Sequence, residues 1–161
     1  MADNARRMRI YLVVMDETEE AKTALRFAGV RARETGGAVH ILALLPRQSF
    51  SAFGAVQATI EQEAAERAES LVREAAGSIF ADSGRMPVIA LRGGYAKDVI
   101  AAYLDDNPDI AALVLGAAPQ GGPGPLVTHF AAEAGLLPCP VYIIPGSLSD
   151  AQVDAIAARG V

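Results

Sequence analysis

The sequence of 161 residues has little cysteine, histidine or positive charge, and it contains no tryptophan. Its one cysteine, Cys139, excludes an internal disulfide framework and suits a reducing compartment. One cysteine and two histidines do not make a zinc-binding set. The net charge of −5 provides no basic surface for nucleic acid or for an anionic membrane.

Long apolar runs are also missing. No stretch approaches the roughly 20 apolar residues of a membrane span, and the run from Ile10 to Met15 is too short for a signal peptide. Yet 52% of the residues are apolar and 20% are charged, which indicates a globular protein with a real core. We expect a single cytoplasmic domain over residues 1–161, with no membrane and no nucleic-acid partner.

Apolar runs rich in β-branched residues alternate with stretches of helical periodicity. The runs predict strands buried on both faces, as in a parallel sheet, over 10–15, 39–45, 88–91, 110–115 and 141–144. The first helix is predicted to follow Asp16 as an acidic N-cap and to end at Gly36-Gly37. A fourth helix is predicted over 126–137 and a short terminal one within 149–159. This alternation predicts a doubly wound α/β domain.

In such a fold, ligands bind at the carboxyl ends of the strands where the strand order reverses. The first and fourth strands are the usual neighbours there, and they end at Asp16 and at Gly116. Asp16 and the Gly- and Pro-rich loop after Gly116 should therefore face one crevice. The sequence has neither GxGxxG, GxxxxGK[ST] nor GxSxG, and no general base and nucleophile pair is evident. We expect no rapid turnover, and slow nucleotide hydrolysis at most.

The loop after Gly116 has features for and against a phosphate site. It leads into a helix N-terminus, which favours anions, but its three prolines remove three N–H donors. No Lys or Arg occurs from Asp98 through Ala158. A phosphate here would depend on Mg²⁺, or on Arg47, Arg92 or Lys97 reaching across. A phosphate site and a purely structural connection both remain open at this point.

Several stretches share their pattern with one known family: YLVVMDETEEAKTALRFA, LRGGYAKDVIAAYLDDNPDIAALVLGA and LPCPVYIIPG. With them the sequence resembles the universal stress protein family over essentially its whole length. The resemblance implies a five-stranded parallel sheet in the order 3-2-1-4-5, the adenine nucleotide alpha hydrolase-like fold. It also implies a homodimer and a role in stress response.

One branch of that family binds ATP through a spaced glycine motif after the fourth strand. Gly116 and Thr128 match its two ends, but Pro119 and Val127 stand at glycine positions and the loop is two residues shorter. Glycines elsewhere in the loop can substitute only in a different loop shape. The resemblance implies ATP or AMP with Mg²⁺ as ligand. The implied nucleotide-binding residues are Val14, Asp16, Leu42, Ala43, Leu115, Gly116, Gly121, Gly122, Gly124, Val127 and Thr128.

Some of these residues also have ordinary structural roles. Asp16 and Thr128 suit helix caps, and Leu42 and Ala43 suit a core strand. Two functions therefore stay open. One is a stress-response regulatory module that binds a nucleotide or another phosphate ligand in the crevice. The other is a ligand-free dimeric module of the same fold that binds proteins.

The last predicted strand indicates how a dimer would form. From Ala134 to Ser149 there is no charged residue, so an edge strand here lacks the lysines that block edge pairing. Pairing with the same strand of a second chain would bury Tyr142 and Ile144. We therefore expect a homodimer through Val141, Tyr142, Ile143 and Ile144. The alternative is that the tail, residues 148–158, folds over this edge.

Overall fold

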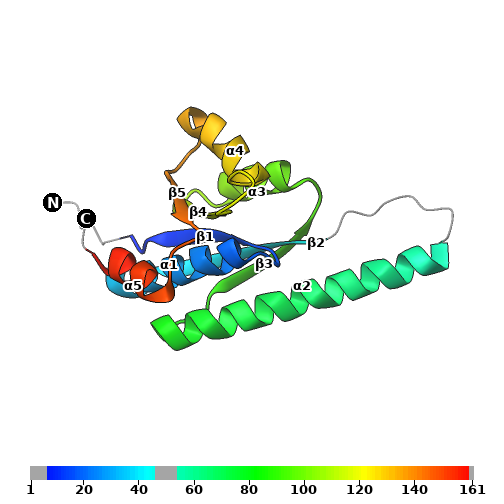
Figure 1. Cartoon of the computed structure of the whole chain (residues 1–161), viewed down its shortest axis with the longest axis horizontal. Helices are drawn as coiled ribbons and strands as arrows, with labels where there is room; N and C mark the ends of the chain where they lie inside the picture. The colour runs from blue at the N-terminus through cyan, green and yellow to red at the C-terminus, as the bar shows by residue number, and fades with distance from the viewer. Residues whose placement is uncertain (1–6, 46–53, 160–161) are drawn as a thin grey trace.

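The computed structural model describes residues 7–45 and 54–159. Its centre is a parallel sheet in the order β3-β2-β1-β4-β5 (Figure 1). The strands are β1 (Ile10–Met15), β2 (Ala38–Leu45), β3 (Val88–Gly93), β4 (Ile110–Ala117) and β5 (Val141–Pro145). The predicted fold class, strand order and five strands are confirmed.

Helices cover both faces of the sheet. They are α1 (Glu19–Thr35), α2 (Gly54–Ser83), α3 (Ala96–Asp106), α4 (Pro125–Ala132), the 3-10 turn η1 (Ala134–Leu136) and α5 (Asp150–Ala158). Figure 1 shows α1, α2 and α5 on one face and α3 and α4 on the other. Right-handed crossovers explain this arrangement, because the connections change face when the strand order reverses after β3.

The strands pack against helices through alternate side chains. From β1, Tyr11 and Val13 enter the core beneath α1, whereas Leu12 and Val14 enter the core beneath α3 and α4. This double burial accounts for the continuous apolar runs of the sequence. Among the described residues, no helix is long and apolar enough to cross a membrane.

The predicted start of the first helix is wrong by two residues. Thr18 is the N-cap, and its hydroxyl oxygen accepts a hydrogen bond from the N–H of Ala21 at 3.2 Å. The Asp16 carboxylate instead accepts from the N–H of Thr18 at 2.9 Å and from its hydroxyl. Asp16 therefore closes the turn that precedes the helix, a common role for aspartate. The predicted end is confirmed, since Gly36 caps α1 with φ 64°.

The predicted helix over 126–137 is also wrong in its second half. α4 ends at Ala132, and a 3-10 turn takes its place from Ala134 to Leu136. Gly135 has a low helix propensity, and Pro138 disfavours the helical conformation of the residue before it. The chain therefore leaves the helix early and tightens into a 3-10 turn before β5.

The predicted tail helix is confirmed as α5, which packs against α1. Its Val153 and Ala157 lie in the same core as the inner face of α1. Among the described strands, β5 pairs only with β4, so the tail does not take the place of a further strand. Ile144 is already buried within the single chain, which corrects the expectation that dimer pairing would bury it.

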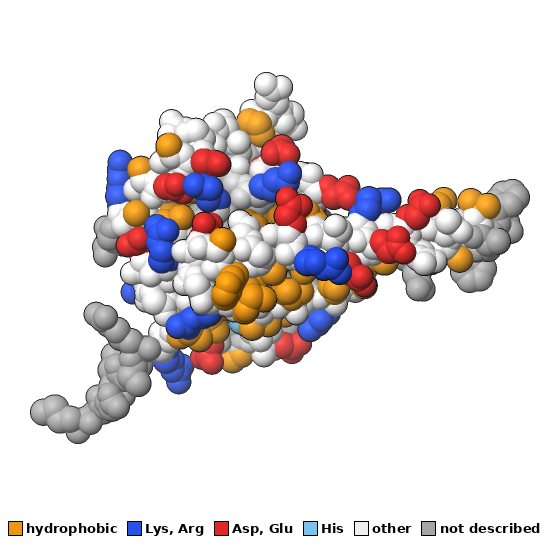
Figure 2. All heavy atoms as spheres, turned by 90° about the horizontal axis from the view of Figure 1, so that it is seen from below, with side chains coloured by type: hydrophobic (Ala, Val, Ile, Leu, Met, Phe, Trp, Pro, Cys, Tyr) orange, Lys and Arg blue, Asp and Glu red, His pale blue; other side chains and the backbone are white. Residues whose placement is uncertain are grey.

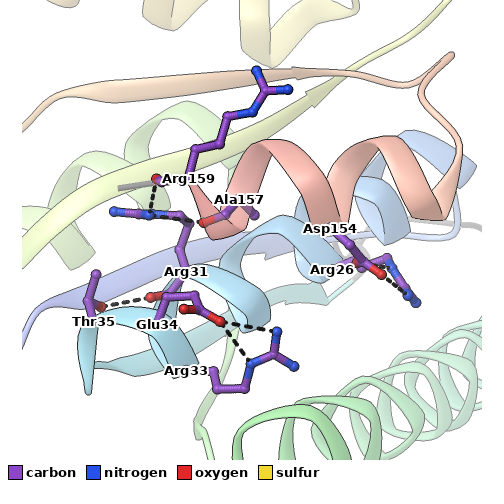
Figure 3. Close-up of polar contacts among 8 residues, drawn as sticks. All are labelled: Arg26, Arg31, Arg33, Glu34, Thr35, Asp154, Ala157 and Arg159. Carbon is purple, nitrogen blue, oxygen red and sulfur yellow. Dashed lines mark hydrogen bonds and ion pairs between the residues drawn. The ribbon is translucent and has the colours of Figure 1, made fainter. Parts of the chain in front are cut away.

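Two arginines of α1 hold α5 in place (Figure 3). Arg31 is the one buried charged side chain among the described residues, and it donates to the carbonyl oxygens of Ala157 and Arg159 at 2.9 Å each. These carbonyls mark the C-terminal end of α5, where the helix dipole favours a cation. Arg26 forms a bidentate pair with Asp154, and this hydrogen bonding lowers the pKa of the Asp154 carboxyl.

We predict that Arg31→Met lowers the free energy of unfolding by about 1–3 kcal/mol, because both carbonyl contacts of a charged donor are lost. Urea denaturation followed by circular dichroism measures this change. Arg33→Met is the matched control, since Arg33 is exposed and its side chain lies 3.3 Å from the carboxylate of its exposed neighbour Glu34. Its effect should stay within about 0.5 kcal/mol. Equal effects of the two variants would contradict the role given to Arg31.

Candidate functional site

The carboxyl ends of β1 and β4 lie side by side, where the strand order reverses. A hollow of 120 Å³ opens between them and the start of α4. Six of the predicted site residues line it: Val14, Asp16, Leu115, Gly116, Gly124 and Val127. Sequence reasoning missed six other lining residues: Thr18, Glu20, Ala21, Pro123, Pro125 and Leu126. Asp16 and the loop after Gly116 therefore line the same hollow.

A second hollow of 240 Å³ lies on the other side of Asp16, between the ends of β1 and β2 and the face of α2. Ala43 lines it, together with apolar side chains that include Leu44, Ala64 and Leu71. Asp16 lines both hollows and therefore stands at their junction. The α2 residues could not be predicted from the sequence, because no local pattern places a helix beside a strand end.

Four predicted site residues line neither hollow. Leu42 is fully buried in the core beneath α3 and α4. The hydroxyl of Thr128 donates to the carbonyl oxygen of Gly124 at 2.9 Å, within the first turn of α4. Gly121 and Gly122 lie in the exposed part of the loop, where both have positive φ. Both glycines adopt a left-handed backbone conformation that other residues rarely adopt, and this conformation shapes the loop.

Gly116 is required by packing. A Cβ atom on this residue would lie 2.0 Å from the carbonyl oxygen of Glu20, in the first turn of α1. Gly146 is similarly close, with its Cβ position 2.6 Å from the carbonyl oxygen of Ala117. The absence of side chains at these two positions lets α1 approach the end of β4. Packing alone therefore accounts for the glycine at the position that matches the start of the ATP motif.

The charge of the first hollow is negative. Of the charged residues that the structure describes, Asp16 and Glu20 line it, and no Lys or Arg does. In the second hollow, Arg67 lies 3.4 Å from the carboxylate of Glu17. Arg92 lines a separate hollow of 400 Å³ beside α3. A polyphosphate in the first hollow would therefore meet two carboxylates without a compensating cation from its walls.

Two further cations were candidates on sequence grounds, Lys97 and Arg47. Lys97 is exposed on α3 and lines neither hollow, and Arg47 falls outside the described residues. The described residues also contain no cluster of three or more His, Cys, Asp or Glu that could hold a metal ion.

A hydrogen-bonded pair lies near the hollow beside α3. His40 Nδ1 is 2.8 Å from the hydroxyl of Tyr103, which lines that hollow. Burial lowers the pKa of His40 and raises the pKa of Tyr103. At neutral pH the imidazole is therefore uncharged, and the tyrosine hydroxyl is able to donate to Nδ1.

Together, the sheet order and the crevice define an adenine nucleotide alpha hydrolase-like domain. The model of the Universal stress protein family matches residues 8–145. The chain belongs to the universal stress protein family. The match ends at Pro145, before α5. Among curated proteins, none matches this sequence significantly.

Solved structures agree with this fold. The universal stress protein UspA from Lactobacillus plantarum is 20% identical, with a TM-score of 0.71 over 86% of this chain and 98% of that one. A universal stress protein in complex with cAMP is 18% identical, with a TM-score of 0.62 over 86% and 98% of the two chains. The universal stress protein from Archaeoglobus fulgidus in complex with dAMP is 23% identical, with a TM-score of 0.54 over 85% and 97%.

We predict that Gly116→Ala lowers the free energy of unfolding by about 1–3 kcal/mol, because the new methyl group overlaps the Glu20 carbonyl. Thermal and urea denaturation test this. Gly77→Ala is the matched control, since Gly77 lies within α2 with nothing within 4 Å of its Cβ position. That change should raise stability by about 0.5–1 kcal/mol through helix propensity. A neutral Gly116→Ala variant would contradict the packing argument.

We predict that part of the stability is lost as the pH falls below about 6.5. The folded state holds the His40 pKa below that of the unfolded chain, so acid protonates the unfolded chain first. His40→Gln should therefore unfold with a weaker pH dependence between about pH 5 and 7.5. Urea denaturation across this range gives the comparison. Parallel curves for the two proteins would exclude His40 as the cause.

Proposed function

We propose that this protein is a cytoplasmic regulatory module of the stress response that binds an adenine mononucleotide at the two hollows around Asp16. The observation that carries the proposal is the position of Asp16 between an apolar-walled hollow and the start of α4. Family membership supports it, as do the related universal stress protein structures in complex with cAMP and with dAMP. In this proposal the base occupies the hollow beside Ala43 and Leu44, and the sugar lies near Asp16.

The phosphate end is where this chain departs from an ATP site. Pro125 occupies the first position of α4 and offers no N–H, which weakens the helix N-terminus as an anion site. Asp16 and Glu20 add repulsion that grows with each phosphate. We therefore propose AMP rather than ATP as the preferred ligand, with Mg²⁺ offsetting part of the penalty for ATP.

We predict that calorimetry without Mg²⁺ gives affinities in the order AMP, ADP, ATP, with AMP at least about tenfold tighter than ATP. Added Mg²⁺ should narrow this gap. The nucleotide released by heating the purified protein should also contain adenine. Absence of binding by AMP, ADP and ATP alike would overturn the nucleotide proposal.

Two neighbouring alanines on α2 provide a test of where the nucleotide binds. Ala64 lines the second hollow, whereas its neighbour Ala65 has similar exposure and lines neither hollow. Ala64→Trp should fill the hollow and weaken AMP binding at least about tenfold, the loss expected from excluding the base. Ala65→Trp should leave it unchanged. Equal affinities for the two variants would place the nucleotide elsewhere.

A second candidate is the dimeric interaction module that needs no ligand. The open edge of β5 favours it, because Ile143 is 41% exposed there and no charged residue guards the strand. Tyr142 lies on the opposite face of β5, edge-to-face with Phe27 at 5.8 Å between ring centres. We propose that two copies pair through this edge.

We predict that Ile143→Lys converts a dimer into a monomer in sedimentation experiments, because the lysine places a charge on the pairing strand. Leu136→Lys is the control, since Leu136 is 87% exposed and lies on η1, outside β5. Loss of the dimer in both variants, or in neither, would contradict pairing through β5.

A further inference from the structure

The strand at the other edge of the sheet is poorly covered. Among the described strands β3 pairs with β2 alone, and Ala90 is its one buried residue. Val88 is 50% exposed and Ile89 is 42% exposed, although their side chains point to opposite faces of the sheet. Apolar surface is therefore open on both faces of β3 as well as along its edge.

The apolar surface extends beyond the strand. Phe80, near the end of α2, and Met86, just before β3, are each at least half exposed. Figure 2 shows apolar side chains gathered on one face of the molecule, with both basic and acidic side chains at the margin. A contiguous apolar area rimmed by charge is typical of an interaction site.

The charges at the two ends of the apolar β3 segment have the same sign, although one carboxylate, that of Asp106, lines the same hollow as Arg92. Residues 86–91 carry no charge, and an arginine stands at each end of this segment. Arg85 contacts the sulfur of Met8, and Arg92 donates to the carbonyl oxygen of Leu91 at 3.1 Å. No ion pair joins either arginine to a carboxylate within the part of the chain that the structure describes. Neither guanidinium group is therefore neutralised by a direct ion pair among these residues, which favours an acidic partner.

This charge pattern opposes pairing between two copies of β3. An antiparallel pair that overlaps residues 86–91 fully would place Arg85 of one copy beside Arg92 of the other, at both ends. Like charges opposite each other on neighbouring strands destabilise the pair. The same arginines would instead attract acidic side chains that flank an apolar strand.

A hollow beside the strand offers room for a partner side chain. The 400 Å³ hollow at the carboxyl end of β3 is lined by Arg92, Val99, Ala102 and Tyr103, among others. The Arg92 guanidinium lies 6.0 Å from the centre of the Tyr103 ring, so the cation rests beside an aromatic wall. Recognition by strand addition uses backbone hydrogen bonds for affinity and such side pockets for specificity.

We propose that the edge of β3 binds an extended segment of a partner protein by strand addition. The segment has apolar residues at its centre, over Val88 and Ile89, and acidic residues at its ends, beside Arg85 and Arg92. This surface is separate from Asp16 and from the free edge of β5. The inference therefore stands independently of the nucleotide proposal.

The test uses two capped synthetic peptides with the same alternating Val-Thr centre. One has glutamate pairs at both ends and the other has lysine pairs. NMR spectra of the full-length protein at low salt should show the acidic peptide shifting the amide signals of residues 86–93. The lysine peptide should bind at least about tenfold more weakly, and added salt should weaken the acidic peptide.

Charge-reversal variants sharpen the test. Arg85→Glu and Arg92→Glu should each weaken the acidic peptide at least about tenfold and improve binding of the lysine peptide. Arg73→Glu is the matched control, because Arg73 is exposed on α2 and lies outside β3. It should leave both affinities unchanged. Circular dichroism confirms that each variant is folded.

Three outcomes would overturn the proposal. The first is that the acidic peptide at millimolar concentration shifts no amide signal of β3. The two arginines would then serve only to prevent aggregation through this edge. The second is that both peptides bind equally well. The third is that sedimentation detects a dimer, and that Ile89→Lys dissociates this dimer whereas Ile143→Lys does not. A second copy of the chain would then occupy the edge of β3.

Discussion

The close approach of α1 to the end of β4 is the constraint on which the rest of the structure depends. It requires glycine at position 116, because any side chain would overlap the Glu20 carbonyl. From this contact α1 runs across β1 and β4, packs against α2 and carries α5 through Arg26 and Arg31. The same contact brings Glu20 to the wall of the crevice, so the packing that builds the site also gives it negative charge.

The fold decides where the site lies, whereas the side chains that line the site decide which ligand it can bind. The reversal of strand order places a crevice between β1 and β4 whatever side chains line it. Its ligand depends on the lining, where Asp16 and Glu20 face a loop whose prolines limit the available N–H groups. A family fold with a carboxylate-lined crevice is consistent with a ligand that carries little phosphate charge.

The two edges of the sheet also differ in chemistry. β5 is an edge strand with no charged residue in it or next to it in sequence, whereas β3 has an arginine at either end of its apolar segment. In a parallel sheet both edges present unpaired backbone groups, and the flanking charges decide which strands can join them. An uncharged edge accepts a second copy of itself, and a positively flanked edge favours an acidic strand.

Residue order alone determined the strands, the first helix end at Gly36 and the terminal helix, because apolar runs and glycine act locally. It also placed Asp16 opposite Gly116, since the first and fourth strands are the usual neighbours at the point where the strand order of a doubly wound sheet reverses. Only the tertiary structure decided that Thr18 rather than Asp16 caps α1, that Ala64 and Leu71 wall a second hollow and that Arg31 is buried under α5. The second hollow and the burial of Arg31 depend on contacts between elements distant in sequence, which no local pattern records. The cap at Thr18 depends on the backbone shape of the turn after β1, which residue order alone did not reveal.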